Sequence, residues 1–263
     1  MPPTIEVKSP DDGIRAQREA TAQRVINLHG DQLPDASLLC LLDDQDWQPF
    51  KAATGARSRG FYKPVRRKDS DWEMAPYYVV KSLFDVEGRP LFDNFVYLYG
   101  STCSTDLGLA MTLSHELRHF VQHDLLPTLW AANALVTRLL SDLSMPEVRA
   151  MGVSGWCDVP HERDAMLAAK SAAEGLFGIE LVTRYIDSKI AQRVTDQDAD
   201  DWRCIRGLVT SAAFDWVNET RLFFPRLKGH KHVLEAYLRE SVDDADFKGV
   251  NLEELLGGVR DRS

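Results

Sequence analysis

The sequence predicts an α+β protein, with its few strands in the first hundred residues and helices over most of the rest. The clearest strand covers residues 93–100, where β-branched and aromatic side chains run up to Gly100. Beyond it, apolar residues recur at helical spacing almost to the end of the chain, as they do in 128–143. These observations indicate a small N-terminal sheet followed by a mostly helical portion.

The remaining segments fit this outline, and no flexible linker divides the chain. We therefore expect one domain over residues 1–263, with an α+β lobe at about 1–105 and a helical lobe at about 106–263. On the N-terminal side we expect a strand at 5–7 and a helix that runs from Asp11 or Asp12 to His29 and ends at Gly30. We also expect a strand at 60–62, within the Pro- and Gly-rich stretch 48–76. Periodicity does not assign the apolar runs at 37–42 and 77–84 to helix or strand. Expected on the C-terminal side are helices at 128–143, 161–177, 179–194, 198–223, 230–241 and 251–256, with a loop at 151–156.

Composition and charge narrow the class of protein. The chain has 263 residues, of which 44% are hydrophobic and 27% charged, as in ordinary globular proteins. Its net charge of −9 argues against general nucleic-acid binding, and no apolar stretch reaches the length of a membrane span. The N-terminus lacks the basic and apolar segments of a secretory signal. We expect a cytoplasmic protein that binds neither nucleic acid nor membrane.

The stretch from His115 to His119 has the spacing His-Glu-x-x-His. In a helix of 3.6 residues per turn, the two histidines lie one turn apart on one face, where both imidazoles can bind one zinc ion. Glu116 lies at the edge of that face, where its carboxylate can take a proton from a water that the metal activates. The pattern therefore predicts the machinery of zinc-dependent peptide hydrolysis.

The residues around the motif favour the helix that this geometry requires. Thr105 or Asp106 can cap the start of the helix and Pro127 stops it, which predicts a helix over about 106–124. The alternative is a surface helix with two solvated histidines. The apolar face consists of Leu113, Leu117, Phe120 and Val121.

A catalytic zinc site needs a third protein ligand. His123 lies about 12 Å of helix rise from His115, which is too far for both to hold one ion. The metzincin arrangement requires a glycine three positions after the second histidine and a histidine three positions further on, where this chain has Gln122 and Leu125. The third ligand is therefore expected from another segment.

The best candidate for the third ligand is Glu162. Asp158 can serve as the N-cap and Pro160 as the first residue of a helix that runs to Phe177, so Glu162 falls in its first turn. The other interpretation of Glu162 is a carboxylate that the helix dipole favours at an N-terminus. Small residues on this helix would allow a close approach to the motif helix: Ala165, Ala168, Ala169, Ala172 and Ala173.

With these residues the sequence resembles the gluzincins, zincin-type metallopeptidases in which two histidines come from His-Glu-x-x-His and a glutamate from a downstream helix. The resemblance covers about residues 90–180, and Ala165 matches the small residue that follows the glutamate in several such families. Met166 departs from the longer glutamate motifs of the best-known members. The resemblance implies a zincin-like fold. It also implies one Zn²⁺ per chain, held by His115, His119 and Glu162, with Glu116 as the catalytic base. Alternative third ligands are Asp158, His161 and Asp164.

The resemblance also implies where a substrate would lie. In the zincin fold an edge strand just before the active-site helix lines the cleft and can pair with an extended substrate. The strand at 93–100 is the candidate, which makes Tyr97 and Tyr99 expected substrate contacts, although an ordinary core strand is equally consistent with the sequence. A group that stabilises the developing oxyanion is also expected. Candidates for it are Tyr97, Tyr99, His161, His230 and His232.

The four cysteines are scattered without paired spacing, which is typical of reduced thiols in a cytoplasm. Cys103 and Cys157 lie near the predicted site in sequence and are candidates for accessory ligands, although an isolated cysteine is more often a small buried residue. The other two are Cys40 and Cys204.

The sequence thus predicts a zinc metallopeptidase, a hydrolase that acts on protein or peptide substrates. Two other classes of function remain open. One is a catalytically inactive zincin-fold protein with a regulatory or interaction role that still binds zinc, and the other is a metal-free interaction protein. Zinc content measured together with peptide hydrolysis separates the three.

Overall fold

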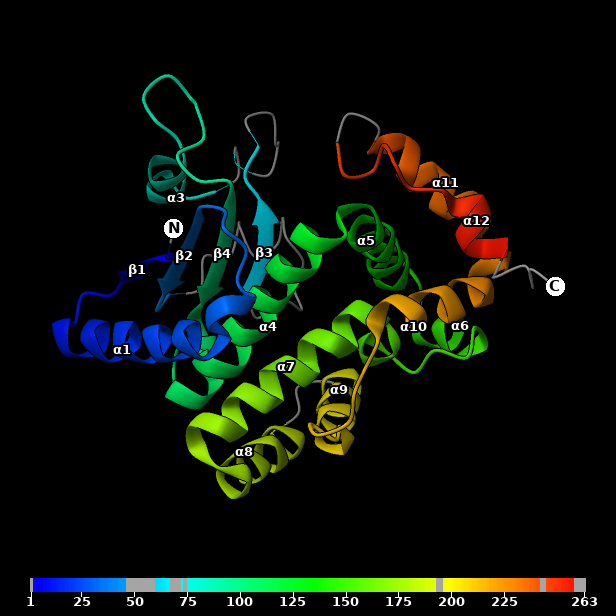
Figure 1. The fold of residues 1–263 in the computed structure, drawn as a ribbon. Coiled ribbons are helices and arrows are strands. Elements are labelled where there is room, and N and C mark those ends of the chain that lie inside the picture. Colours follow the sequence, from blue (N-terminus) through cyan, green and yellow to red (C-terminus); the bar gives the residue numbers. More distant parts are fainter. Residues whose placement is uncertain are drawn as a thin grey trace. The chain divides into compact units, whose positions relative to one another are not determined.

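The computed structural model describes residues 2–45, 60–66, 72, 75–192, 196–241 and 245–257. Over these ranges the expected α+β class is confirmed, with the strands early in the chain and helices through most of the remainder (Figure 1). The chain groups into two compact units. The first is Met1–Val121 with Ala172–Gly178, and the second is Gln122–Ser171 with Ile179–Ser263.

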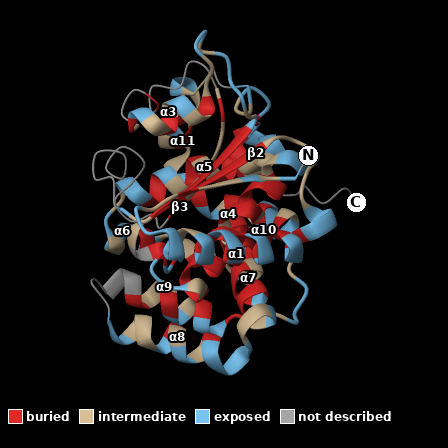
Figure 2. Ribbon diagram, turned by 90° about the vertical axis from the view of Figure 1, so that its left-hand side faces the viewer, coloured by how far each residue is buried: buried red, intermediate tan, exposed pale blue. Residues whose placement is uncertain are grey.

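The first unit contains a mixed sheet. Within the described ranges its strands are β1 (Thr4–Lys8), β2 (Leu38–Asp43), β3 (Gly60–Pro64) and β4 (Asn94–Tyr99), in the spatial order β1-β2-β4-β3. β1, β2 and β4 are parallel, and β3 is antiparallel to β4. β4 therefore lies inside the sheet between β2 and β3, and the expectation of an edge strand at 93–100 is wrong. Every residue of β2 and β4 is buried, as Figure 2 also shows for β2.

Helices cover both faces of this sheet. α1 (Asp12–His29) connects β1 to β2, is capped by the Asp11 side chain and ends at Gly30, whose φ of 40° suits a glycine. α1 and α4 (Asp106–Leu125) lie on one side of the sheet, and α3 (Tyr77–Leu83) lies on the other (Figure 1). Of the two unassigned apolar runs, 37–42 is thus a strand and 77–84 a helix. The core on the α3 side consists of Leu39, Leu41, Val65, Trp72, Val79, Leu83, Phe95, Tyr97 and Tyr99.

The second unit is helical. Its core is the apolar stripe of α5 packed against residues of the later helices, including Phe223, Phe224, Leu234 and Leu256. Its helices are α5 (Pro127–Asp142), α6 (Met145–Ala150), α7 (Pro160–Phe177, shared with the first unit), α8 (Ile179–Ala191), α9 (Asp196–Gly207), α10 (Trp216–Phe223), α11 (Lys231–Glu240) and α12 (Leu252–Gly257). Short 3₁₀ segments in the chain are η1 (Gly30–Gln32), η3 (Gly100–Thr102), η4 (Trp156–Asp158) and η5 (Phe224–His230).

Two helical predictions need correction. The helix expected over 198–223 is two helices, because Gly207 ends α9 and Asp215 starts α10 by accepting hydrogen bonds from the backbone N–H groups of the following turn. Between the predicted helix at 128–143 and the predicted loop at 151–156 lies an unpredicted helix, α6, which begins where the Glu147 carboxylate accepts a 2.8 Å hydrogen bond from the backbone N–H of Ser144. Across the described ranges, no helix combines the length and the apolar character that crossing a bilayer requires.

Candidate metal centre

The motif helix α4 carries two histidine rings whose nitrogens converge. The Nε2 atoms of His115 and His119 are 3.1 Å apart, and the rings are almost perpendicular, with centroids 4.6 Å apart and an interplanar angle of 89°. His119 is buried and His115 is partly exposed. This is the arrangement that residues one helical turn apart can adopt when they share a ligand.

The orientation of this histidine face is fixed by the opposite face of α4. The four apolar residues of that face, Leu113, Leu117, Phe120 and Val121, are each no more than 4% exposed. Thr105 is the N-cap, since its Oγ1 accepts a 3.1 Å hydrogen bond from the Gly108 N–H. Asp106 instead accepts hydrogen bonds from Gln17 and Thr21 of α1. The predicted helix, its apolar stripe and its cap are therefore confirmed.

The edge strand β3 runs along α4 beside the motif. A Cβ atom at Gly60 would lie 2.3 Å from Leu98 Cδ2, 2.8 Å from the Tyr97 carbonyl oxygen and 3.4 Å from Thr112 Cγ2, so only glycine fits between these neighbours. Further along β3, the ring of Tyr62 packs on that of Phe120, with centroids 5.9 Å apart. Thr112 and Phe120 bracket the two histidines, so β3 follows the part of α4 that carries the motif.

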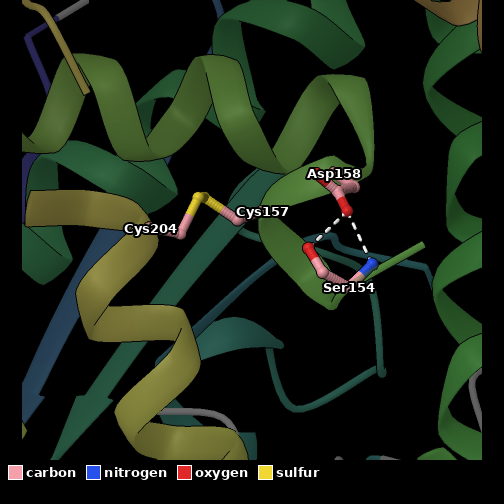
Figure 3. The surroundings of a disulfide bond; sticks show 4 residues. All are labelled: Ser154, Cys157, Asp158 and Cys204. Carbon is pink, nitrogen blue, oxygen red and sulfur yellow. Dashed lines mark hydrogen bonds between the residues drawn. A yellow bond between two sulfur atoms is a disulfide. The ribbon is translucent and has the colours of Figure 1, made fainter. Parts of the chain in front are cut away.

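Helix α7 begins at Pro160, as predicted, but not with the predicted cap. The first helical hydrogen bond runs from the Arg163 N–H to the Val159 carbonyl at 2.9 Å, which makes Val159 the N-cap residue. The Asp158 carboxylate instead accepts 2.6 Å hydrogen bonds from the backbone N–H and the hydroxyl of Ser154 (Figure 3). Asp158 therefore shapes the loop before the helix.

A disulfide bond anchors the same segment. Cys157, in η4, is bonded to Cys204 of α9, with their Cα atoms 6.3 Å apart (Figure 3). The expectation of four reduced thiols is wrong for this pair, because the fold brings together cysteines that are 47 residues apart in sequence. Cys157 is thus no candidate ligand. Cys103 is free but buried, and burial raises the pKa of its thiol to about 12, which disfavours the thiolate that a metal would need.

Gln122 joins α4 to the first turn of α7. Its side chain is fully buried, and Nε2 donates hydrogen bonds to the His161 carbonyl at 2.9 Å and to Asp164 Oδ2 at 2.7 Å. The sequence singles out Gln122 only as a departure from the metzincin pattern. Its place three residues beyond His119, on the side of the helix that carries the histidines, is the signal that could have identified it.

Glu162 completes a group of potential metal ligands. One ligand atom from each of His115, His119 and Glu162 lies within 4.8 Å of the other two, and no second such group of His, Cys, Asp or Glu occurs among the described residues. The alternative third ligands have other contacts. His161 Nε2 is 3.3 Å from Glu162 Oε1, Asp164 binds Gln122, and Asp158 binds Ser154.

The residues of this group suit zinc. Two nitrogens bound tetrahedrally at 2.0–2.1 Å from one zinc ion lie about 3.3 Å apart, close to the 3.1 Å between the Nε2 atoms here. Two imidazoles and one carboxylate also form a known ligand set of catalytic zinc, which leaves one coordination position for water or substrate. Glu116 follows His115 directly, is 5% exposed, and carries a carboxylate that such a site can use as a base.

The two tyrosines expected to contact substrate are buried in the sheet. Tyr97 is 1% exposed and Tyr99 is 2% exposed. The Tyr97 hydroxyl donates a 2.9 Å hydrogen bond to Asp43, and burial, followed by the charge of Asp43, raises the pKa of this phenol far above its usual value. Their predicted role depended on an edge position that β4 does not have, and neither ring is open to a substrate in this structure.

Three further histidines of the second unit, His123, His230 and His232, are not part of the ligand group. His123 Nε2 is 2.7 Å from Asp246 Oδ2, in keeping with its exclusion from the zinc ligands on geometry. His230 is the last residue of η5 and is partly exposed, and His232 is exposed on α11.

Comparison of the chain with protein-family models, with curated proteins and with solved structures gave no match. The function proposed below is inferred from the chain's own residues.

Proposed function

We propose that this chain is a zinc-dependent metallopeptidase of the zincin type, with the ligand arrangement of a gluzincin, that hydrolyses peptide bonds in protein or peptide substrates. The observation that carries the proposal is the grouping of His115, His119 and Glu162, with the carboxylate of Glu116 next to the first ligand. A small mixed sheet beside the motif helix, with an antiparallel edge strand, supports a zincin-like fold.

Each residue has a distinct role in this proposal. The neutral rings of His115 and His119 and the ionised carboxylate of Glu162 hold the ion. A zinc ion held by these residues would supply polarisation of the substrate carbonyl and acidification of a bound water, whose pKa would fall to about 7. Glu116 accepts the proton of the attacking water and delivers it to the leaving amine, so that the amine departs neutral.

The test combines metal content with hydrolysis. Protein purified without chelator is expected to contain about one zinc per chain, and to cleave members of a peptide library followed by mass spectrometry. Glu116→Gln should keep the zinc and lose cleavage, because it removes the base and not a ligand. Glu174→Gln, which removes one carboxylate from α7 outside the ligand group, is the matched control and should cleave normally.

Two results would contradict the proposal. Stoichiometric zinc without cleavage of any peptide would indicate a catalytically inactive regulatory or interaction protein. Absence of zinc, combined with failure to take up added ZnCl₂, would indicate a metal-free interaction protein.

A further inference from the structure

A single buried side chain binds the first turn of α7 on both sides of Glu162. Gln122 is 0% exposed, and its Nε2 donates to the carbonyl of His161 at 2.9 Å and to the carboxylate of Asp164 at 2.7 Å. One acceptor precedes Glu162 by one residue and the other follows it by two. Both N–H donors of one amide are thus used on the turn that carries the candidate third ligand.

The two acceptors make this contact specific. Asp164 is 6% exposed, so its carboxylate depends on protein donors for part of its solvation. A side chain without an N–H donor at position 122 would leave both acceptors without this partner. The first turn of α7 would then lose these two hydrogen bonds to α4, which bear on its rotation about the helix axis.

Gln122 belongs to the same helix as the two histidine ligands. It lies three residues beyond His119, which in an α-helix makes the two neighbours on one side, about 4.5 Å apart along the axis. Helix α4 thus carries two candidate ligands, His115 and His119. About one turn further on it carries Gln122, which binds the turn of α7 that contains Glu162. Precise placement of ligands by surrounding hydrogen bonds is a general requirement of metal sites.

We propose that Gln122 is a positioning residue of the metal site, which sets the rotation of the first turn of α7 so that Glu162 meets His115 and His119. This inference rests on the proposed zinc function. It assigns to Gln122 no contact with the metal or the substrate.

Other contacts keep α7 in place when Gln122 is changed. The Cys157–Cys204 disulfide fixes the segment before the helix, and Lys170 donates from the middle of the helix to the carbonyls of Arg206 and Leu208. We therefore expect Gln122→Met, which conserves volume and removes both hydrogen bonds, to fold. Its effect should be confined to the first turn.

The matched control is a second buried amide in the same unit. Asn133 of α5 is also 0% exposed, and its Nδ2 donates to the Leu129 carbonyl at 2.9 Å and to Thr220 Oγ1 at 3.2 Å. Asn133→Leu removes a comparable pair of hydrogen bonds without touching α7. Both variants should lose thermal stability in the metal-free state, but only Gln122→Met should lose zinc affinity.

The experiment measures the Kd for Zn²⁺ by competition with a chromophoric chelator. For Gln122→Met the Kd should rise roughly 10- to 100-fold, as is usual when an outer partner of a metal ligand is removed. For Asn133→Leu it should equal the wild-type value. The visible d–d absorption of Co²⁺, which reports coordination geometry, should change in Gln122→Met and stay unchanged in Asn133→Leu. If Gln122→Met does not fold, Gln122→Asn, which is one methylene shorter and cannot reach both acceptors, takes its place.

The possible outcomes separate a failure of the positioning role of Gln122 from a failure of the proposed zinc function. Wild-type zinc affinity and a wild-type Co²⁺ spectrum in a folded Gln122 variant would overturn the positioning role alone. Equal loss of zinc affinity in Asn133→Leu would show a general effect of stability and would overturn it as well. A wild-type protein that binds no zinc would overturn both the proposed function and this inference.

Discussion

Removal of the Cys157–Cys204 disulfide should destabilise the protein by several kcal/mol. The two cysteines are 47 residues apart, and cross-linking a loop of this length lowers the entropy of the unfolded chain. The chain-entropy relation gives about 4 kcal/mol at 25 °C for such a loop. The perturbation is the double variant Cys157→Ser, Cys204→Ser, which prevents the bond and keeps small side chains at both positions.

The assay is urea unfolding followed by tryptophan fluorescence, on the oxidised wild type, the wild type with a dithiol reductant, and the double variant. We expect the reduced wild type and the double variant to unfold at the same lower urea concentration, and the variant to be unaffected by the reductant. A thiol count on the unreduced, denatured wild type should find only Cys40 and Cys103. Four reactive thiols, or equal free energies of unfolding with and without the bond, would refute the reasoning.

The remaining predictions concern the site and its scaffold. Glu116→Gln should reduce kcat by roughly 10²- to 10⁴-fold and retain its zinc. His119→Ala should lose the zinc, and full metal content in His119→Ala would exclude the motif as the metal site. Burial lowers the pKa of His29 to about 4 from 6.5, so the folded state takes up fewer protons than the unfolded state between these values. The free energy of unfolding should therefore be greatest above pH 6.5 and fall by about 3 kcal/mol as the pH drops to about 4; an unchanged pH dependence in His29→Gln would contradict this. Gly60→Ala should lower the free energy of unfolding by about 1–3 kcal/mol, because the added Cβ would lie 2.8 Å from the Tyr97 carbonyl oxygen. A free energy of unfolding in urea equal to that of the wild type would show that β3 does not pack as described.

The parts of the fold that local chemistry determines could be predicted from the sequence. Helix α4 has a capping Thr105, an apolar stripe and a Pro127 just beyond its end, and the structure has the helix where these signals place it. The histidine pair follows from helical spacing alone. Within 198–223 the apolar pattern hid a break, because Asp215 acts through hydrogen bonds to the next turn and not through periodicity.

The parts that depend on tertiary contacts could not be predicted in the same way. Strand order decides whether β4 is an edge or an interior strand, and nothing in residues 93–100 encodes that β3 pairs on its far side. The disulfide joins cysteines from η4 and α9, which have no shared motif. The sequence favoured Glu162 as the third ligand partly by resemblance and left Asp164 as an alternative. In the folded chain, Asp164 accepts a hydrogen bond from Gln122, and this contact could not be read from the sequence.

The central claim is that His115, His119 and Glu162 hold one zinc ion, and anomalous scattering at the zinc absorption edge tests it most directly. Crystals of the protein purified without chelator should give one strong anomalous peak per chain. That peak should be contacted by the Nε2 atoms of His115 and His119 and by the carboxylate of Glu162. Absence of a peak at this position after soaking in ZnCl₂, or a peak whose third ligand is His161, Asp164 or Asp158, would contradict the account.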